Sequence, residues 1–492
     1  MELSDISVFN SIRNDARQFL HDPAYYTVKQ SADWFLSTAP EFYILMLGEI
    51  PIGYFRTSNR TKDSIWIGLD IAMEHRGNGY SIPAYRMFMD MLKSQGIRTF
   101  YLRVLAINII AEHVYKKLGF VVVSTEYNKN RGSMDILMEY KVDDEDYSHI
   151  YQSLTYNELE ALNDSTYLVT GCNGFIGVWL LNFFVYLKFA HKFNIQVEAV
   201  DVQDKISDLV PAVALQDGMI RYHRLNIASD HDVKYEFTDS RIDYIFNCAG
   251  IAVPTEYMRK PIETLDVSYM GTRNIMELAR EFNVKSVVCF SSSEVYGSPE
   301  DEAIPTVESH VGRIHTHSNR SCYDVGKLVL ETLCYTYNNK FNVPVKVIRP
   351  FNLYGPMMND TRVVPNMMRR ILSGEPFRIY GDGLQTRTFC YMADAMVMIL
   401  KVALNGRGGE IYNVGNSEPE VTIFGLHYEL DRALGTTSKL EQVPYPSNYP
   451  DNEPRRRCPD ISKVVELTGY TPMVSLARGL GKTYQYFKDK TV

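Results

Sequence analysis

The sequence predicts a two-domain α/β protein, with a compact mixed α/β domain followed by a doubly wound parallel sheet that carries a smaller C-terminal lobe. Three observations predict this fold class. The chain of 492 residues exceeds the usual size of one domain. An acidic, polar stretch separates two segments that each contain a glycine turn. In the second segment, short β-branched runs alternate with helical stretches, as in βαβ units. We expect a first domain at 1–142, a linker at 143–164 and a second domain at 165–492.

The expected elements follow from the periodicity of apolar residues. In the first domain we expect strands at Phe42–Leu47, Pro51–Thr57, Ser64–Ile71 and Thr99–Val104, and helices at Ser81–Ser94 and Asn108–Leu118. In the second domain we expect strands at Thr166–Thr170, Val197–Val202, Tyr244–Cys248, Ser286–Ser291 and Val345–Arg349. Loops rich in Gly, Pro and Asn after Pro350 predict the smaller substrate-binding lobe.

Composition and charge exclude several classes of protein. Hydrophobic residues make up 45% and charged residues 22%, which is typical of a globular protein. The net charge of −8 argues against a nucleic-acid partner. Seven isolated cysteines without metal-ligand spacing predict reduced thiols and no metal site. No signal peptide is evident, and the apolar run at 178–190 is too short to span a membrane. We therefore expect a cytoplasmic protein without membrane contact.

Two motifs in the first domain carry chemistry. Arg76, Gly77 and Gly79 lie between a strand and a helix, whose first turn presents unpaired N–H groups that can hold a pyrophosphate. Alone, such a turn is equally well explained as a polar loop. Further on, Asn108 and Tyr115 fall on one face of a helix.

Together these motifs resemble those of the GNAT acetyltransferases. The family's Arg/Gln-x-x-Gly-x-Gly/Ala turn matches at Arg76 and Gly79, with Ser81 where Gly or Ala is usual. Its Asn-x-x-Ala-x-x-x-Tyr-x-x-x-Gly-Phe run matches from Asn108 to Phe120.

The resemblance implies that acetyl-CoA binds with its pyrophosphate on the glycine turn and that an amine is acetylated. Asn108 and Tyr115 would face the cofactor, and Tyr115 would donate a proton to the departing sulfur. Asp70 and Glu74 are candidate bases for the amine, although each is more often a solvated carboxylate at a loop edge.

The second domain begins with a G-x-x-G-x-x-G turn between a strand and a helix, where the backbone can approach a pyrophosphate. The expected dinucleotide contacts in this turn are Gly171, Gly174, Phe175, Ile176 and Gly177. Asp201 ends the next strand, and its carboxylate suits the ribose hydroxyls of NAD and repels the 2′-phosphate of NADP. We therefore expect NAD.

A Tyr/Lys pair is the strongest catalytic signal. Tyr323 and Lys327 are four residues apart on one helical face, where the ammonium group is expected to lower the pKa of the phenol so that it acts as a base. In FSSSEVYG, at a strand end, Ser292 is placed to hydrogen-bond substrate and Glu294 to donate or accept a proton. Each residue also has a structural explanation, such as a core tyrosine or a surface lysine.

From about Thr166 to its end, the chain resembles the extended short-chain dehydrogenase/reductase family, which implies a Rossmann-like fold and a homodimer through the Tyr/Lys helix and the helix before it. The segments SSSEVYG, RSCYDVGK, QTRTFCYMADA and RRRCPDI resemble the UDP-glucuronate decarboxylases. Dehydratases usually carry Asp-Glu where this chain has Ser293-Glu294. Two departures from the pattern are Cys458 in place of Lys and Asn226 in place of an acidic residue.

This resemblance implies NAD-dependent oxidation of UDP-glucuronate at C4 and loss of CO₂, giving UDP-xylose or a UDP-4-keto-pentose. Tyr323, Lys327, Ser292, Glu294 and Arg457 would be catalytic. Asn352, Arg387 and Tyr257 would bind the UDP-sugar.

Other functions stay open from the sequence. The second domain is also compatible with a nucleotide-hexose 4-epimerase, with a 4,6-dehydratase, or with a non-catalytic regulator that binds nucleotide sugars. The acetyl acceptor is a UDP-linked 4-amino sugar, by analogy with a fusion of such a decarboxylase to a formyltransferase, or an unrelated amine such as a protein N-terminus or a polyamine.

Overall fold

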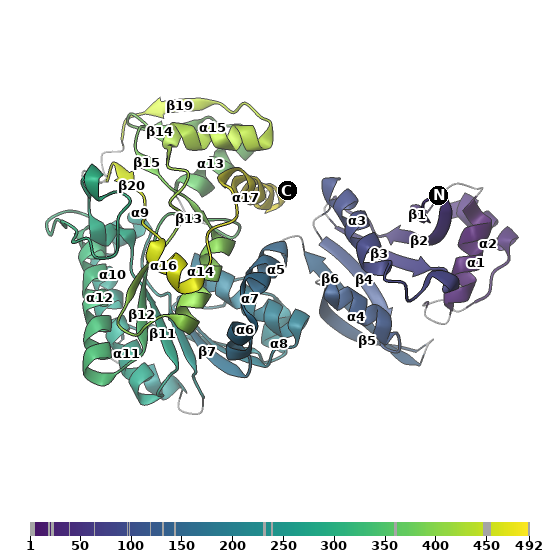
Figure 1. The fold of residues 1–492 in the computed structure, drawn as a ribbon, viewed down its shortest axis with the longest axis horizontal. Coiled ribbons are helices and arrows are strands. Elements are labelled where there is room, and N and C mark those ends of the chain that lie inside the picture. The colour runs from purple at the N-terminus through teal and green to yellow at the C-terminus, as the bar shows by residue number, and fades with distance from the viewer. Residues whose placement is uncertain are drawn as a thin grey trace. The chain divides into compact units, whose positions relative to one another are not determined.

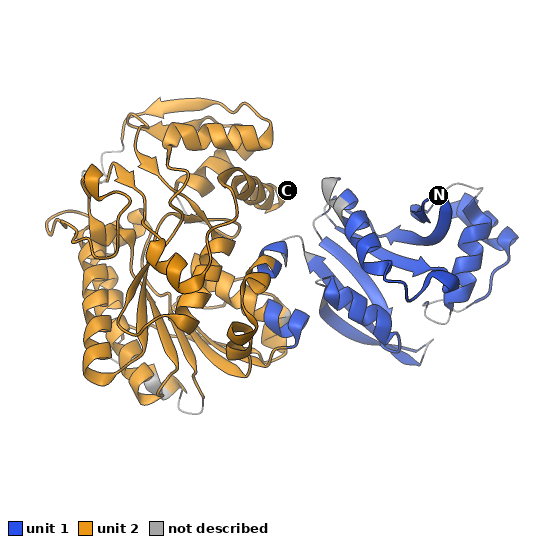
Figure 2. Ribbon diagram, in the orientation of Figure 1, with its two compact units in different colours: residues 1–148, 186–192 blue, residues 149–185, 193–492 orange. Residues whose placement is uncertain are grey.

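The structure is a computed structural model, shown in Figure 1. It describes residues 5–17, 20, 24–38, 40–62, 64–95, 97, 99–118, 120–129, 132–141, 144–229, 233–237, 240–358, 362–445 and 454–490. The chain divides into two compact units, one of residues 1–148 and 186–192 and the other of residues 149–185 and 193–492 (Figure 2).

The N-terminal unit is built on one six-stranded sheet with the order β1-β2-β3-β4-β6-β5. Its elements are α1 (Ile6–Ala16), α2 (Val28–Thr38), β1 (Phe42–Leu47), β2 (Ile50–Ser58), β3 (Ser64–Ile71), η3 (Met73–His75), α3 (Ser81–Ser94), β4 (Thr99–Leu105), α4 (Ile109–Lys117), β5 (Val121–Asn128) and β6 (Ser133–Lys141). All six elements expected from the sequence are present, and their ends differ by no more than one residue. The elements α1, α2, β5 and β6 are not among those expected from the sequence.

Successive side chains of β2 face opposite sides of this sheet, as pleating requires. Phe55 stacks on Phe88 of α3 with a ring separation of 4.1 Å. Its neighbour Tyr54 instead contacts Phe9 of α1 at 4.8 Å. One face of the sheet therefore packs on α3 and α4, and α1 covers part of the other face.

Among the described residues of this sheet, β3 and β4 are the only parallel neighbours, and they diverge. Their pairing runs only from Ser64 and Thr99 to Trp66 and Tyr101. Beyond this point β3 continues to pair with β2 and β4 with β6. The sheet therefore opens at the carboxyl ends of β3 and β4, next to the glycine turn that leads into α3.

The segment expected as a linker contains two helices, α5 (Asp144–Ser153) and α6 (Tyr156–Leu162). Thr155 and Glu158 form a capping box at the start of α6. The Glu158 carboxylate also accepts from Lys401 at 2.9 Å and from Asn405 at 2.6 Å, both on α14 (Met392–Asn405). Glu158, one of the acidic residues that indicated a linker, thus serves both as a cap and as a buried ion-pair partner. Its contacts attach α6 to the C-terminal unit.

The C-terminal unit is built on a seven-stranded sheet, all parallel, with the order β17-β12-β11-β10-β7-β8-β9. Its strands are β7 (Ser165–Thr170), β8 (Ile195–Asp201), β9 (Ile220–Arg224), β10 (Tyr244–Asn247), β11 (Ser286–Phe290), β12 (Val345–Pro350) and β17 (Ile411–Val414). The five strands expected here are present within two residues at each end, whereas β9 and β17 were not among them. The strand order reverses between β7 and β10, and ligands bind at such a point in doubly wound sheets.

Helices cover both faces of the large sheet (Figure 1). Leu168 of β7 lies in a core with residues of α11 and α12, whereas Tyr167 stacks on Phe184 of α7 at 4.1 Å. The apolar run at 178–190 lies within α7, as expected for a buried helix. The helical elements through α12 are α7 (Phe175–His191), α8 (Ala212–Gln216), η4 (Val233–Phe237), α9 (Pro254–Arg259), α10 (Pro261–Asp266), the π-helical turn η5 (Val267–Gly271), α11 (Thr272–Glu281), η6 (Ser293–Tyr296), η7 (Asp301–Ala303) and α12 (Ser321–Phe341).

The lobe after β12 is made of short strands and four helices besides α14. They are β13 (Leu353–Tyr354), α13 (Val363–Leu372), β14 (Phe377–Tyr380), β15 (Thr386–Arg387), β16 (Cys390–Tyr391), β18 (Val421–Thr422), α15 (Ile423–Leu434), β19 (Leu440–Val443), β20 (Arg456–Arg457), α16 (Ser462–Thr468) and α17 (Leu476–Lys490). β15 lies between β18 and β20, and its parallel pairing with β20 places Arg387 opposite Arg457.

Two features are absent from the described residues. None of their helices is both long and apolar enough to cross a membrane. Among the same residues, no group of three or more His, Cys, Asp or Glu side chains could hold a metal ion.

Replacing Lys401 by Met should destabilise the C-terminal unit, because it leaves the Glu158 carboxylate buried without its cation. Removing one partner of a buried pair typically costs about 3–5 kcal/mol. Urea unfolding of the purified chain measures this loss, and the double variant Glu158→Gln with Lys401→Met should recover part of it. A single variant as stable as the wild type would show that the pair does not hold α6 in place.

Candidate active sites

The glycine turn after β7 is shaped by close backbone contacts. Gly171 has a φ of 61°, and a Cβ there would lie 2.7 Å from the Cα of Ala249, just after β10. A Cβ on Gly177 would lie 2.6 Å from the carbonyl oxygen of Gly171. Gly174 is exposed at the surface of the turn. The first and third glycines therefore serve packing at the switch point, and the second leaves room for a ligand to approach.

Asp201 lies beside this turn, as the sequence predicts. Its carboxylate accepts from the backbone N–H of Asn173 at 3.1 Å and of Gln203 at 3.3 Å. Phe175 and Ile176 begin α7 and are partly buried. The turn, the helix start and the acidic strand end thus form one surface suited to a dinucleotide with free ribose hydroxyls.

Tyr323 and Lys327 both lie buried on α12. The Lys327 ammonium group donates to the carbonyl of Phe290 at 2.7 Å and lies 5.7 Å from the centre of the Tyr323 ring. Burial lowers the pKa of Lys327 to about 8. The expected lowering of the Tyr323 pKa is not found. Burial raises that pKa, and this effect outweighs the hydrogen bond with Ser292 that lowers it.

Two further residues define the surroundings of the phenol. Tyr257 of α9 stacks on Tyr323 with a ring separation of 5.1 Å and an interplanar angle of 12°. Ser292 caps η6 by accepting from the N–H of Glu294 at 3.2 Å, which fixes its hydroxyl at the end of β11. The tyrosine ring is therefore held on one side by stacking and at its oxygen by a positioned hydroxyl.

A cluster of four charged side chains adjoins the Tyr/Lys pair. The Glu294 carboxylate is bound by Arg320, the N-cap of α12, and accepts from Arg457 of β20 at 2.6 Å. Arg320 also donates from Nε to Asp324 at 3.2 Å. The two carboxylates and two guanidinium groups thus alternate along one chain of contacts, beside Tyr323.

Sequence reasoning identified Glu294 and Arg457 but missed Arg320 and Asp324. The available signal was their i, i+4 spacing around Tyr323 in RSCYDVGK, which places both on one helical face. Burial raises the pKa of Asp324 to about 6. The charge of Asp324 therefore changes near pH 6.

This cluster contains polar atoms without partners. Among the described residues, Nε of Arg457 and Oδ1 of Asp324 are buried and make no hydrogen bond. A hollow of about 330 Å³ is lined in part by Glu294, Arg320 and Asp324. Buried polar groups are normally satisfied, so these atoms mark a place where a polar ligand can bind.

Arg387 and Asn352, the expected contacts for UDP, lie in the lobe. Arg387 is buried and donates to the carbonyls of Thr386 at 2.8 Å and Arg455 at 3.1 Å. The Asn352 amide nitrogen donates to the carbonyl of Thr388 at 3.0 Å, so this nitrogen stabilises the loop. The strand register brings Arg387 beside Arg457, which joins the expected diphosphate site to the charged cluster.

The glycine turn of the N-terminal unit is also well defined. Gly77 and Gly79 have φ values of 79° and 81°, a conformation that favours glycine. Arg76 donates from Nε to the carbonyl of Ile71 at 2.8 Å, which ties the turn to the end of β3. The turn leads directly into α3. The N–H groups in the first turn of that helix have no partners within the helix and therefore lie next to the glycine turn.

Asn108 and Tyr115 lie on α4, as expected. Asn108 is the N-cap, and its side-chain oxygen accepts from Ala111 N at 3.2 Å, whereas its amide nitrogen can donate to a cofactor. The Tyr85 hydroxyl donates to the hydroxyl of Tyr115 at 3.4 Å, and burial raises the pKa of Tyr115, which keeps this phenol protonated. Gly119 of the motif lies outside the described residues.

The two candidate bases differ in their surroundings. Asp70 forms an ion pair with Arg56 and is mostly buried, so its carboxylate is already committed to a cation. Glu74 is exposed in η3, as a solvated carboxylate at a loop edge would be.

Fold and site together define a short-chain dehydrogenase type of nucleotide-dependent enzyme joined to a thioester-cofactor domain. The chain belongs to the NAD dependent epimerase/dehydratase family, whose model matches residues 167–415. The model of the Acetyltransferase (GNAT) family matches residues 7–120. Both family resemblances expected from the sequence are thereby confirmed.

Curated relatives are UDP-glucuronic acid decarboxylases. The chain is 38% identical to UDP-glucuronic acid decarboxylase 1 of Danio rerio over 260 residues, which are 52% of this chain and 60% of that protein. It is 36% identical to UDP-glucuronic acid decarboxylase 6 of Arabidopsis thaliana over 241 residues, 49% of this chain and 68% of that protein. The chain thus spans about 60% of the vertebrate relative's length.

Solved structures share the fold. The UDP-glucuronic acid 4-epimerase of Bacillus cereus in complex with UDP-glucuronic acid and NAD is 26% identical, with a TM-score of 0.55, and the match covers 66% of this chain and 99% of that one. The UDP-glucose 4-epimerase of Thermotoga maritima is 23% identical with a TM-score of 0.58, covering 66% of this chain and all of that one. The second likeness concerns the fold alone.

The Asp324→Asn variant should remove a pH dependence from the large site. Asp324 becomes neutral as the pH falls through about 6, and Arg320 then loses one of its two carboxylate partners. In the wild type, we expect kcat/KM for the reaction of the C-terminal unit to decrease as the pH is lowered, with an inflection near pH 6. The Asn variant should lack this inflection. At every pH its kcat/KM should stay near the value of the wild type at low pH, about 10-fold below the value of the wild type at neutral pH.

The matched control is Asp382→Asn, which alters an exposed carboxylate paired with Arg455. This variant should keep the wild-type profile. An unchanged inflection in Asp324→Asn would assign the titration to another group.

Proposed function

We propose that the C-terminal unit catalyses NAD-dependent oxidative decarboxylation of UDP-glucuronate and that the N-terminal unit transfers an acetyl group from acetyl-CoA to an amine. The observation that supports the first activity best is the cluster of Glu294, Arg320, Asp324 and Arg457 beside Tyr323. The names of the curated relatives support the same reaction.

The first step is oxidation at C4 of the sugar. The glycine turn after β7 and Asp201 would hold NAD, which would supply the hydride acceptor and a positive charge that opposes the effect of burial on the Tyr323 pKa. Tyr323, whose hydroxyl is hydrogen-bonded to Ser292, takes the proton of the C4 hydroxyl directly. Lys327, anchored to Phe290, keeps a positive charge near the phenol, and Asp201 holds the adenosine ribose. The product of this step is a 4-keto sugar.

The second step is loss of the C6 carboxylate, which is β to the new ketone. The C5–C6 bond breaks, CO₂ leaves, and the electron pair moves to the C4 oxygen as an enolate. Ser292 and Tyr323 donate hydrogen bonds to that oxygen. The unpartnered Nε of Arg457 orients the carboxylate, and Glu294 manages protonation at C5. Arg387 binds the diphosphate, and Tyr257 with the Asn352 loop borders the sugar.

A second candidate is epimerisation of UDP-glucuronate at C4, because the solved 4-epimerase bound to that compound shares the fold at 26% identity. An epimerase must keep the carboxylate while the 4-keto sugar turns over in the site. The paired arginines, already neutralised by Glu294 and Asp324, hold the carboxylate only weakly, which favours its departure. Release of CO₂ separates the two reactions.

The N-terminal unit acts on an amine, which attacks the thioester carbonyl so that the C–N bond forms and the C–S bond breaks. Arg76, Gly77 and Gly79 would hold the pyrophosphate of acetyl-CoA, and Asn108 would contact the cofactor through its amide nitrogen. Tyr115 donates its proton to the departing sulfur. The acceptor is a UDP-linked 4-amino sugar, which an aminotransferase of another chain would form from the 4-keto product.

The protein acts as a homodimer through α12 and the preceding helices. Ile262 on α10, Tyr269 in η5 and Tyr335 on α12 are exposed apolar side chains, with exposures of 65%, 47% and 60%. A second copy would cover them.

UDP-glucuronate incubated with the chain and NAD should lose the mass of CO₂, as followed by mass spectrometry. Tyr323→Phe should lower this rate by about 10²–10⁴-fold, because the ring stays and the proton acceptor is lost. Binding of UDP should be nearly unchanged in the variant. Loss of water from UDP-glucose, with UDP-glucuronate left intact, would contradict the assignment.

Tyr115→Phe should slow acetyl transfer to a UDP-4-amino-pentose by about 10²-fold or more, with little effect on the KM for acetyl-CoA. Release of free CoA measures the rate. Tyr127→Phe, at an exposed tyrosine of the same unit, is the control and should behave as the wild type. Good transfer to peptides with none to any amino sugar would overturn the acceptor.

A further inference from the structure

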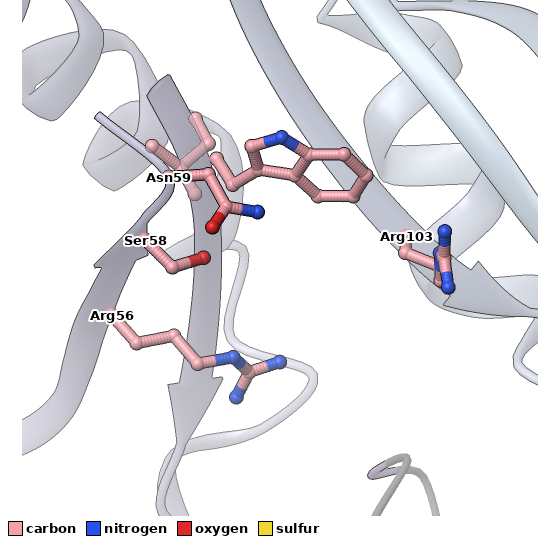
Figure 3. A pocket seen from close by; sticks show the side chains of 6 residues that line it. Arg56, Ser58, Asn59 and Arg103 are labelled. Atoms are coloured by element: carbon pink, nitrogen blue, oxygen red, sulfur yellow. The ribbon is translucent and has the colours of Figure 1, made fainter. Parts of the chain in front are cut away.

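A hollow of about 340 Å³ lies over the sheet of the N-terminal unit, within the usual size range of ligand sites. It is lined by Arg56, Ser58, Asn59, Trp66, Ile67 and Arg103. Figure 3 shows Arg56, Ser58 and Asn59 on one wall and Arg103 across from them. Two guanidinium groups, an indole, an amide and a hydroxyl thus converge on one space, which the acetyl-CoA turn does not use.

The hollow opens on the face of the sheet opposite α3 and α4. Ile65 and Leu102 belong to the core under those helices, and their sequence neighbours Trp66 and Arg103 therefore point the other way. Arg56 lies on the same side as Tyr54, which packs on α1. The cofactor turn and the hollow are thus on different sides of the opening between β3 and β4.

The Arg103 guanidinium group is accessible to an anion in the hollow. Its guanidinium group lies 5.5 Å from the Trp66 ring, which in turn stacks on Tyr101 at 5.6 Å. The nearest carboxylates, of Asp135 and Glu126, are 3.9 and 4.0 Å away, at the outer limit of an ion pair. The side chain is 38% exposed, so a phosphate can approach more closely than these carboxylates do.

Arg56 links the hollow to the catalytic hydroxyl. It lies over Gly68, where a Cβ would come within 2.8 Å of its Nε, and it pairs with Asp70. Tyr115 belongs to the opposite face, yet its hydroxyl is close enough to be influenced by the charges of both Arg56 and Asp70. The charges of Arg56 and Asp70 therefore act on the Tyr115 phenol, and Arg56 itself lines the hollow.

We propose that this hollow is the acceptor site of the N-terminal unit and that it recognises a nucleoside diphosphate, an inference that rests on the proposed acetyl transfer. The base stacks on Trp66, and the Asn59 amide bonds to its polar edge. The diphosphate is held by Arg103, and the attached amino sugar extends past Arg56 towards Tyr115. Two arginines would repel a polyamine, which argues against that class of acceptor.

Calorimetric titration with UDP tests the site in the full chain, with NAD and CoA present to occupy the other nucleotide sites. We expect two UDP molecules per chain. Arg387→Ala should remove the site in the C-terminal unit and Arg103→Gln the site in the N-terminal unit, so each variant should bind one.

Kinetics should agree with the titration. Arg103→Gln and Trp66→Ala should each raise the KM for a UDP-linked amino sugar by about 10-fold, with kcat changed less than about 3-fold. Decarboxylation of UDP-glucuronate should be unchanged. Arg60→Ala is the matched control, because Arg60 follows Asn59 but pairs with Glu41 and does not line the hollow.

The outcomes separate this inference from the proposed function. A single UDP site that Arg387→Ala abolishes would overturn the inference, whether or not acetyl transfer occurs. Two sites, of which Arg103→Gln removes one, would support it. If two sites bind and no amino sugar is acetylated, the nucleotide site stands and the acceptor in the proposed function falls.

Discussion

The ion bridge at Glu294 is the interaction on which the larger site depends. Its carboxylate joins Arg320 of the catalytic helix to Arg457 of the lobe, and Glu294 itself follows the end of β11. Three elements from distant parts of the chain are thereby fixed around one point. Because the bridge is buried, losing one partner would leave an uncompensated charge and loosen the lobe from the sheet.

This bridge also divides the chemistry between two groups of residues. In the proposed reaction, Tyr323 and Lys327 near the end of β11 would serve oxidation, whereas Arg457 of the lobe would orient the carboxylate. Tyr323 and Asp324 are consecutive on α12, so one helix positions the base and a member of the charged cluster. In the N-terminal unit, residues from two faces of a sheet also act on each other. The strands β3 and β4 diverge, and the charge of Arg56 influences the pKa of Tyr115 on the opposite face.

Much of the fold and part of the site could be predicted from local sequence. Gly177 is required by close contacts with Gly171 and Cys172 within a single strand–turn–helix, and Tyr323 and Lys327 are related by one helical repeat. Gly171 instead approaches Ala249, which lies far away in the sequence. The contact between Glu294 and Arg457 spans 163 residues and was accessible only through family resemblance. The pKa of Tyr323 was wrongly expected to fall, because the spacing of Lys327 does not reveal how deeply the phenol is buried.

The most direct test of this account follows NADH absorbance and ¹³CO₂ release in one single turnover of UDP-glucuronate labelled at its carboxyl carbon. With Arg457→Gln at saturating substrate, the account predicts that the NADH transient forms at nearly the wild-type rate. Release of ¹³CO₂ should then fall about 10²-fold, because the group that orients the carboxylate is lost. Equal loss of both signals, or no loss of either, would contradict the separation of oxidation from decarboxylation.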